Sequence, residues 1–109
     1  EIMDKRVKDT LLTLGIRSTY QGFHYIKHAL CLCLDDGDKI QSICKYIYPE
    51  VARKYQTSQD NVEHCMRTAI AYCWYNGNRE YLIKIARYPL KEKPTNSEFL
   101  DILYNALEG

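Results

Sequence analysis

Polar side chains between residues 59 and 68 have the types and the spacing of residues that read DNA bases. Arginine can donate paired hydrogen bonds to guanine, glutamate can accept from the amino group of cytosine, and glutamine or histidine can donate or accept. The side chains that we predict to contact bases are Gln59, Glu63, His64, Arg67 and Thr68. They lie opposite an apolar stripe through Val62 and Met66, so one helix would present all of them to the same groove.

Basic residues that could bind the DNA backbone surround this segment. The chain carries a net charge of only +1, but residues 1–38 contribute −1, residues 39–91 contribute +5 and residues 92–109 contribute −3. A basic centre attracts an anionic partner even when the whole chain is close to neutral. The predicted phosphate contacts are Lys45, Arg53, Lys54, Arg79, Lys91 and Lys93. Because the basic excess is modest, we expect one copy to bind weakly and a dimer or tandem pair to occupy DNA.

A helix-turn-helix at about residues 49–75 would position the base-contacting side chains. Ala52 is small enough for the place where the two helices cross. Gln56 falls at the turn position that requires left-handed backbone angles, a position that glycine usually fills. Ser58 can cap the second helix, which we predict from Ser58 to Tyr75.

Apolar residues recur at helical spacing along almost the whole chain, and no segment alternates strictly. The predicted fold class is therefore all-α: a compact bundle of about six helices that forms one domain over residues 1–109. The predicted helix ends are Gly15 after the first helix, Ser18 or Thr19 as cap of the second, Asp38 as cap of the third, Asn78 as cap of the fifth, and a capping box over Thr95–Glu98. We expect Gly77 to close the fourth helix in the left-handed conformation.

Composition and motifs argue against several other classes of protein. No apolar run reaches the roughly 18 residues of a membrane span, and no secretory signal is present. The five cysteines are expected to be reduced, buried thiols of a cytoplasmic protein. The chain has no phosphate-binding glycine loop, zinc-protease pair or paired-carboxylate motif, so we expect neither an enzyme nor a cofactor. A zinc ion held by His24, His28 and Cys31, without an evident fourth ligand, is a subsidiary hypothesis.

Several segments together match one known family in order and spacing. The most distinctive is Lys93–Phe99, which reads KPTNSEF. The others are Gly22-Phe23 with Tyr25, Ile47–Ala52, Val62-Glu63 with Arg67–Ile70, and Trp74 followed by Gly77-Asn78. On these segments the chain resembles the C-terminal effector domain of the stage-zero sporulation response regulator, the master transcription factor of spore-forming Gram-positive bacteria.

The resemblance implies a six-helix domain that binds double-stranded DNA as a homodimer, and the lack of an apolar span already predicts no membrane partner. It also implies a phosphorylatable receiver domain upstream of Glu1, so we expect the chain to be a segment of a longer two-component response regulator. Glu63, His64 and Arg67 would read bases. Residues 74–86 would lie near the contact with the RNA polymerase sigma subunit. The partner surface expected on this basis is Tyr75, Asn78, Arg79 and Leu82.

The chain departs from the family pattern at the helix expected to enter the major groove. The family usually has arginine where this sequence has His64, and it is usually more basic where this sequence has Asp60 and Thr68. A histidine cannot form the two parallel bonds to guanine that an arginine forms. An alternative hypothesis is therefore a divergent protein-interaction module, for a sigma subunit or a dimer partner, with weakened DNA binding.

Overall fold

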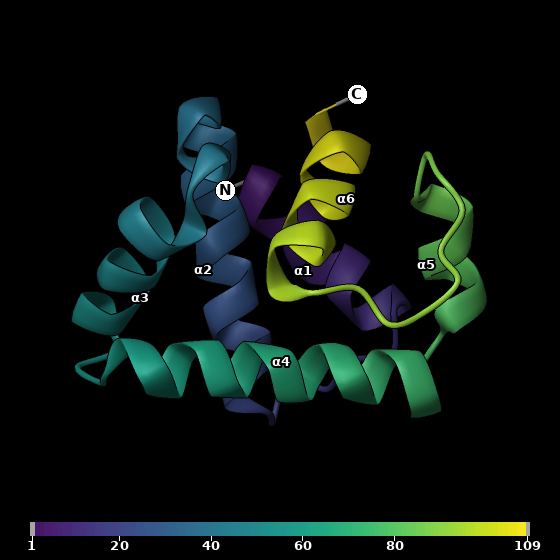
Figure 1. The fold of residues 1–109 in the computed structure, drawn as a ribbon, viewed down its shortest axis with the longest axis horizontal. Coiled ribbons are helices and arrows are strands. Elements are labelled where there is room, and N and C mark those ends of the chain that lie inside the picture. The colour runs from purple at the N-terminus through teal and green to yellow at the C-terminus, as the bar shows by residue number, and fades with distance from the viewer. Residues whose placement is uncertain (1, 109) are drawn as a thin grey trace.

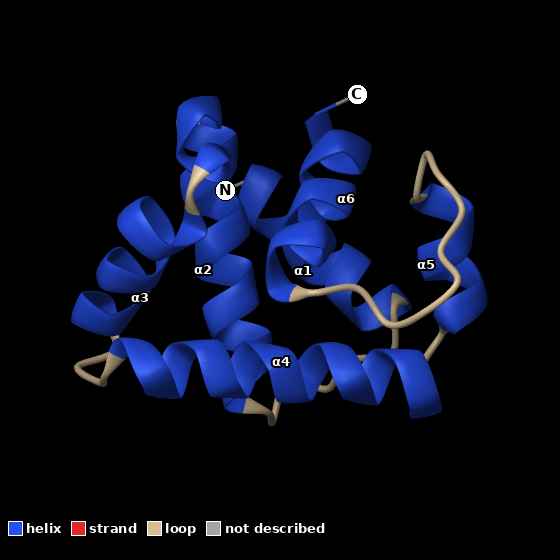
Figure 2. Ribbon diagram, in the orientation of Figure 1, coloured by secondary structure: helices blue, strands red, loops and turns tan. Residues whose placement is uncertain are grey.

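The computed structural model describes residues 2–108, and all of the regular structure in that range is helical (Figure 2). The elements are α1 (Ile2–Thr13), α2 (Gln21–Asp35), the 3₁₀ turn η1 (Gly37–Gln41), the π-helical turn η2 (Ile43–Ile47), α3 (Tyr48–Lys54), α4 (Gln59–Asn76), α5 (Arg79–Ile85) and α6 (Asn96–Glu108). The predicted all-α bundle of about six helices is confirmed. Within residues 2–108, no helix combines the length and the apolar character needed to cross a membrane.

Helix α4 runs along one side of the molecule, and four of the other helices pack against it (Figure 1). It contacts α2, α3, α5 and α6, with α3 near its first residues and α5 beyond its last. The apolar stripe predicted through Val62 and Met66 is buried and continues along α4, while the neighbouring Cys65 is only partly buried. The buried members are Val62, Met66, Ala69, Ile70, Cys73 and Trp74. Burial of this stripe leaves the opposite face of α4 for solvent or for a partner.

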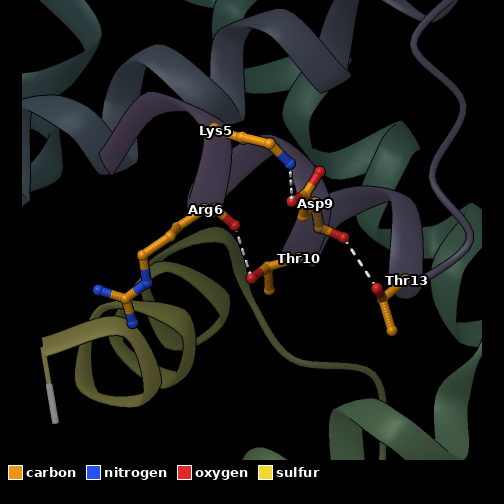
Figure 3. A network of polar contacts seen from close by, with 5 residues as sticks. All are labelled: Lys5, Arg6, Asp9, Thr10 and Thr13. Atoms are coloured by element: carbon orange, nitrogen blue, oxygen red, sulfur yellow. Dashed lines mark hydrogen bonds and ion pairs between the residues drawn. The ribbon is translucent and has the colours of Figure 1, made fainter. Parts of the chain in front are cut away.

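Helix α1 is tied to the end of the fold through Arg6. The Nη2 group of Arg6 donates to the backbone carbonyl of Leu107, at the end of α6, at 3.1 Å. Figure 3 shows the contacts inside α1: Lys5 pairs with Asp9 at 2.9 Å, and two threonine hydroxyls donate to carbonyls four residues earlier. The first and last helices are therefore held together.

Several of the predicted helix ends are confirmed. The hydroxyl of Ser58 accepts from the N–H of Asn61 at 3.0 Å, and the side chain of Asn78 caps α5 in the same way. In the capping box, the N–H of Thr95 donates to the Glu98 carboxylate at 2.8 Å and the N–H of Glu98 donates to the Thr95 hydroxyl at 3.1 Å. Gly15 ends α1 with φ +83°. Each of these ends depends on contacts within a few residues, which is why the sequence reveals them.

Two predicted caps are wrong. Helix α2 begins at Gln21, so neither Ser18 nor Thr19 caps it, because the residues before it form a tight turn of their own. At the start of η1, the carboxylate of Asp36 accepts from the N–H of Asp38 at 3.1 Å. The capping side chain is therefore Asp36 rather than Asp38, and the turn begins earlier than expected.

The role predicted for Gly77 is also wrong. Gly77 ends α4 with φ −96°, outside the left-handed region. Glycine suits this position because a Cβ atom there would lie 2.7 Å from the carbonyl oxygen of Leu14, in the loop after α1. The constraint is close backbone approach between distant segments, not the local turn.

The five cysteines carry thiols, but only two of them are buried as predicted. Cys33 and Cys73 lie in the core, where burial raises the pKa of each thiol to about 11. These thiols therefore stay protonated and unreactive at neutral pH. Cys31 and Cys65 are partly buried, and the prediction of a buried thiol is wrong for Cys44, which is exposed on η2.

Candidate nucleic-acid interface

Helices α3 and α4 are joined by a tight turn with the local geometry that the sequence predicts. Gln56 has φ +53° and is the only non-glycine residue with positive φ in the described part of the chain. The N–H of Thr57 donates to the carbonyl of Ala52 at 3.0 Å, and Ala52 is buried between the two helices. The turn therefore sets the angle at which α4 leaves α3.

The side chains predicted to contact bases lie along the outer face of α4. Gln59, His64, Arg67 and Thr68 are exposed, and Glu63 is partly exposed. Three of them touch: Nε of Arg67 lies 3.2 Å from Oε2 of Glu63, and Nη2 of Arg67 lies 3.2 Å from Nδ1 of His64. We call Glu63, His64 and Arg67 the Arg67 cluster. Within residues 2–108, Gln59 and Thr68 make no side-chain hydrogen bond to it.

A hollow of about 370 Å³ lies beside the Arg67 cluster. Glu63 and Arg67 form part of its wall, and the rest comes from residues 43–48 and 93–97. Lys93 lines the same hollow, so a predicted phosphate contact and a predicted base contact share one surface. Cys44 also lines it, which places η2 at this surface as well.

Asn96 connects three helices next to this hollow, a role that the sequence does not indicate. It is only 7% exposed, and its Nδ2 group donates to the hydroxyl of Tyr48 at 2.9 Å and to the carbonyl of Glu63 at 3.1 Å. Burial raises the pKa of the Tyr48 hydroxyl, which therefore stays protonated at neutral pH. The first residues of α3 and α6 are thus bonded together and to the segment of α4 that carries Glu63.

The predicted phosphate contacts lie at several separate places around α4. Arg53, paired with Glu50, and Lys54 end α3 next to the start of α4, while Lys45 lies on η2. Lys91 and Lys93 belong to the loop before α6. Arg79 lies beyond the far end of α4, whose 18 residues span about 27 Å.

The surface expected to meet a sigma subunit is only partly available. Tyr75 is 71% exposed, and Arg79 stacks its guanidinium over Trp74 at 5.1 Å. Asn78 is exposed, but its amide caps α5 and also donates to the carbonyl of Thr13. Leu82 is fully buried, so it is removed from the predicted surface. Its helical spacing in α5 points it into the core.

The zinc hypothesis finds no support in the side-chain positions. His24 lies against the carbonyl of Ser18, with Nε2 at 2.7 Å from it. His28 packs its ring edge against Tyr55, and the thiol of Cys31 lies 3.8 Å from the carboxylate of Asp4. Among residues 2–108, no three His, Cys, Asp or Glu side chains are grouped closely enough to hold a metal ion.

His28 should make the stability of the fold depend on pH. Burial lowers its pKa from 6.5, and the charge of Lys54 lowers it further. The unfolded chain therefore binds the proton more tightly, so stability should fall as the pH drops below about 6.5. In urea unfolding at several pH values between about 7.5 and 5.5, His28→Gln should show a shallower loss of stability than the wild type. Lys54→Gln should also reduce the slope, and identical slopes in all three proteins would contradict this account.

One comparison with known proteins bears on this surface. A family model described as "Sporulation initiation factor Spo0A C terminal" matches residues 7–107. The matched range contains α2 to α5 entirely, together with most of α1 and α6. It therefore covers the Arg67 cluster, the turn before α4 and the Asn96 contacts.

Proposed function

The chain belongs to the family of C-terminal domains of the sporulation initiation factor Spo0A, and from this we propose that it regulates transcription by placing α4 in the major groove of DNA. Membership makes it a DNA-binding domain of Spo0A-type transcription regulators. The proposal goes further, to the helix and the side chains that contact the DNA. The observation that carries it is the exposed Arg67 cluster on α4, directly after a tight turn between two helices.

In the proposed complex, the outer face of α4 contacts base edges. Arg67 can donate to guanine, Glu63 can accept from cytosine, and Gln59 can bond adenine. His64 and Thr68 directly follow Glu63 and Arg67 in α4, and both are exposed. The side chain of Arg67 is 49% exposed and that of Glu63 is 41% exposed, so both can reach a partner without a change of fold.

The DNA backbone would be bound on both sides of α4. Lys93 lines the hollow next to Arg67, with Lys45 on the adjoining turn η2. Arg53 and Lys54 project from the end of α3. We propose these four as the main phosphate contacts, with Lys91 and Arg79 further from the Arg67 cluster. Binding should therefore weaken steeply as salt rises, because each neutralised phosphate releases counterions.

The remaining partners are also proposals. The expected upstream receiver domain would control pairing of two copies on DNA. The exposed side chains of Tyr75 and Arg79 would face the RNA polymerase sigma subunit, next to Ile83, which is 43% exposed. Leu82 would support this surface from the core.

Arg67→Ala tests the proposal directly. We expect it to weaken binding to a selected site by about 1–3 kcal/mol and to leave binding to random DNA much less affected. Fluorescence-anisotropy titrations at several salt concentrations would measure both. Arg87→Ala, which removes the same charge from an exposed loop after α5, is the matched control. An equal loss on both kinds of DNA would make Arg67 a phosphate contact.

The alternative, a protein-interaction module with weakened DNA binding, gives a different result. The folded wild-type domain would then bind neither selected nor sporulation-type promoter DNA at low salt, yet would still co-purify with a sigma subunit. The occupation of Arg67 by two intramolecular partners is the observation in favour of this alternative.

A further inference from the structure

The guanidinium group of Arg67 is held along one edge and free along another. Its Nε forms an ion pair with the carboxylate of Glu63 and its Nη2 lies against Nδ1 of His64, each at 3.2 Å. Nε and Nη2 form the side edge of the guanidinium plane. Within residues 2–108, Nη1 makes no hydrogen bond. The terminal Nη1–Nη2 pair therefore keeps donors for a ligand that presents two acceptors.

The contact also fixes which nitrogen of His64 carries a proton. A guanidinium has only donors, so the ring nitrogen that faces it must accept. Nδ1 of His64 is therefore unprotonated in this contact, and the proton of the neutral ring lies on Nε2. His64 uses its acceptor on Arg67 and retains a single donor on its outer edge.

We propose that His64 is a positioning residue for Arg67 rather than a second base-reading side chain. Together with Glu63 it holds the Nε–Nη2 edge and presents the Nη1–Nη2 pair to guanine. This inference rests on the proposed function of α4. It assigns different roles to two side chains that spacing alone predicts to be equivalent base contacts.

Both holding contacts are needed for this effect. An exposed ion pair four residues apart on a helix is weak, so Glu63 alone restrains a long arginine side chain poorly. A second acceptor three residues away fixes the plane of the group as well as its position. An arginine held in this way loses less rotamer freedom when it binds a base, which favours binding to guanine.

Two substitutions at His64 separate positioning from direct base contact. The Oδ1 atom of asparagine occupies roughly the place of Nδ1, so His64→Asn keeps an acceptor for Arg67 and loses the outer donor. The amide of glutamine reaches roughly the place of Nε2, so His64→Gln keeps the outer donor and loses the inner acceptor. His64→Ala removes both. Since His64 is exposed, all three variants should unfold at the wild-type temperature.

The measured quantity is discrimination for guanine. A duplex site is first selected by the wild-type domain from a random-sequence library. The affinity of each variant is then compared on that site and on the same site with the Arg67-contacted guanine replaced by 7-deazaguanine, which lacks the N7 acceptor. The discrimination ratio is the affinity for the guanine site divided by the affinity for the 7-deazaguanine site. We expect this ratio to stay within about twofold of wild type in His64→Asn, and to fall by about three- to tenfold in His64→Gln and His64→Ala. The NMR signal of Arg67 Nε–H in the free domain should stay at its wild-type position in His64→Asn alone.

Each other outcome overturns a different statement. If His64→Gln keeps the ratio and His64→Asn loses it, His64 reads a base through Nε2 and the inference is wrong. Equal ratios in all variants, or equal losses in all of them, also contradict it. If the folded wild-type domain selects no sequence at all, the proposed function fails instead, and the NMR comparison still tests the contact between His64 and Arg67.

Discussion

Replacing Gly22 with alanine is expected to destabilise the domain by about 3 kcal/mol or more, beyond the usual range for one added methyl group. A Cβ atom at this position would lie 2.2 Å from the carbonyl oxygen of Cys65 and 2.8 Å from Cβ of Ala69. Both atoms belong to α4, and a backbone oxygen cannot move without moving the helix. In a helix with open space around this position, a glycine-to-alanine change would stabilise the fold by about 1 kcal/mol through helix propensity. We expect destabilisation here only because α2 and α4 cross so closely at Gly22.

Urea unfolding followed by far-ultraviolet circular dichroism would measure this loss, with Gly37→Ala as the matched control. A Cβ atom at Gly37 would also meet an atom closely, at 2.5 Å, but that atom is the hydroxyl of Tyr104 at the end of a flexible side chain. The control should therefore cost less than about 1 kcal/mol. If Gly22→Ala unfolds at the same urea concentration as the control, α2 and α4 do not cross as closely as described.

The position of Gly22 also bears on DNA binding. Helix α4 carries the Arg67 cluster, and α2 packs behind it at the same place. Residual folded Gly22→Ala protein should therefore bind selected DNA more weakly, since separating the helices shifts His64 and Arg67 relative to the phosphate contacts on α3. A wild-type affinity in the folded fraction would mean that the crossing supports the fold without setting the position of α4.

The contrast between Gly22 and Ser58 shows which parts of this fold are readable from sequence. Ser58, Asn78 and the Thr95–Glu98 box act on neighbours within three residues, so their types and spacing indicate the helix ends. The outer face of α4 follows in the same way, because helical spacing fixes which side chains lie opposite the buried stripe. The close approach of Gly22 joins segments more than 40 residues apart, and no short window contains that information.

The functional surface divides in the same way. The residues of the Arg67 cluster are predictable as outward positions, and their spacing of three and four residues even allows the contacts between them. Lys93 and η2 line one hollow together with Glu63 and Arg67. This arrangement depends on tertiary packing, because η2 precedes α4 in the chain and Lys93 follows it. The exposure of Cys44 was mispredicted because η2 is too short for periodicity to fix its inner face. The place of Leu82 on the partner surface came from the family resemblance, whereas helical spacing in α5 agrees with its burial.

Asn96→Ala is expected to cost about 3 kcal/mol of stability, although the removed side chain is small and lies at the end of a helix. Asn96 donates to the Tyr48 hydroxyl and to the Glu63 carbonyl from a site that is 7% exposed. Each lost hydrogen bond costs about 1 kcal/mol, and a buried polar group left without a partner adds about 1–3 kcal/mol. Thermal and urea unfolding of the variant would measure the sum.

Tyr48→Phe separates the two bonds, because it removes the hydroxyl and leaves the contact between Asn96 and Glu63. It should cost about 1 kcal/mol alone and little more when added to Asn96→Ala, since the bond is then already lost. Additive losses in this double-mutant cycle would show that the Asn96–Tyr48 bond contributes nothing. The alternative result is that the losses are coupled and that Asn96→Ala also loses more affinity for selected DNA than for random DNA. These two results together would mean that the start of α6 holds α4 in the orientation that Arg67 requires. The segment that identifies the family in the sequence, Lys93–Phe99, would then act on DNA partly through the backbone of Glu63.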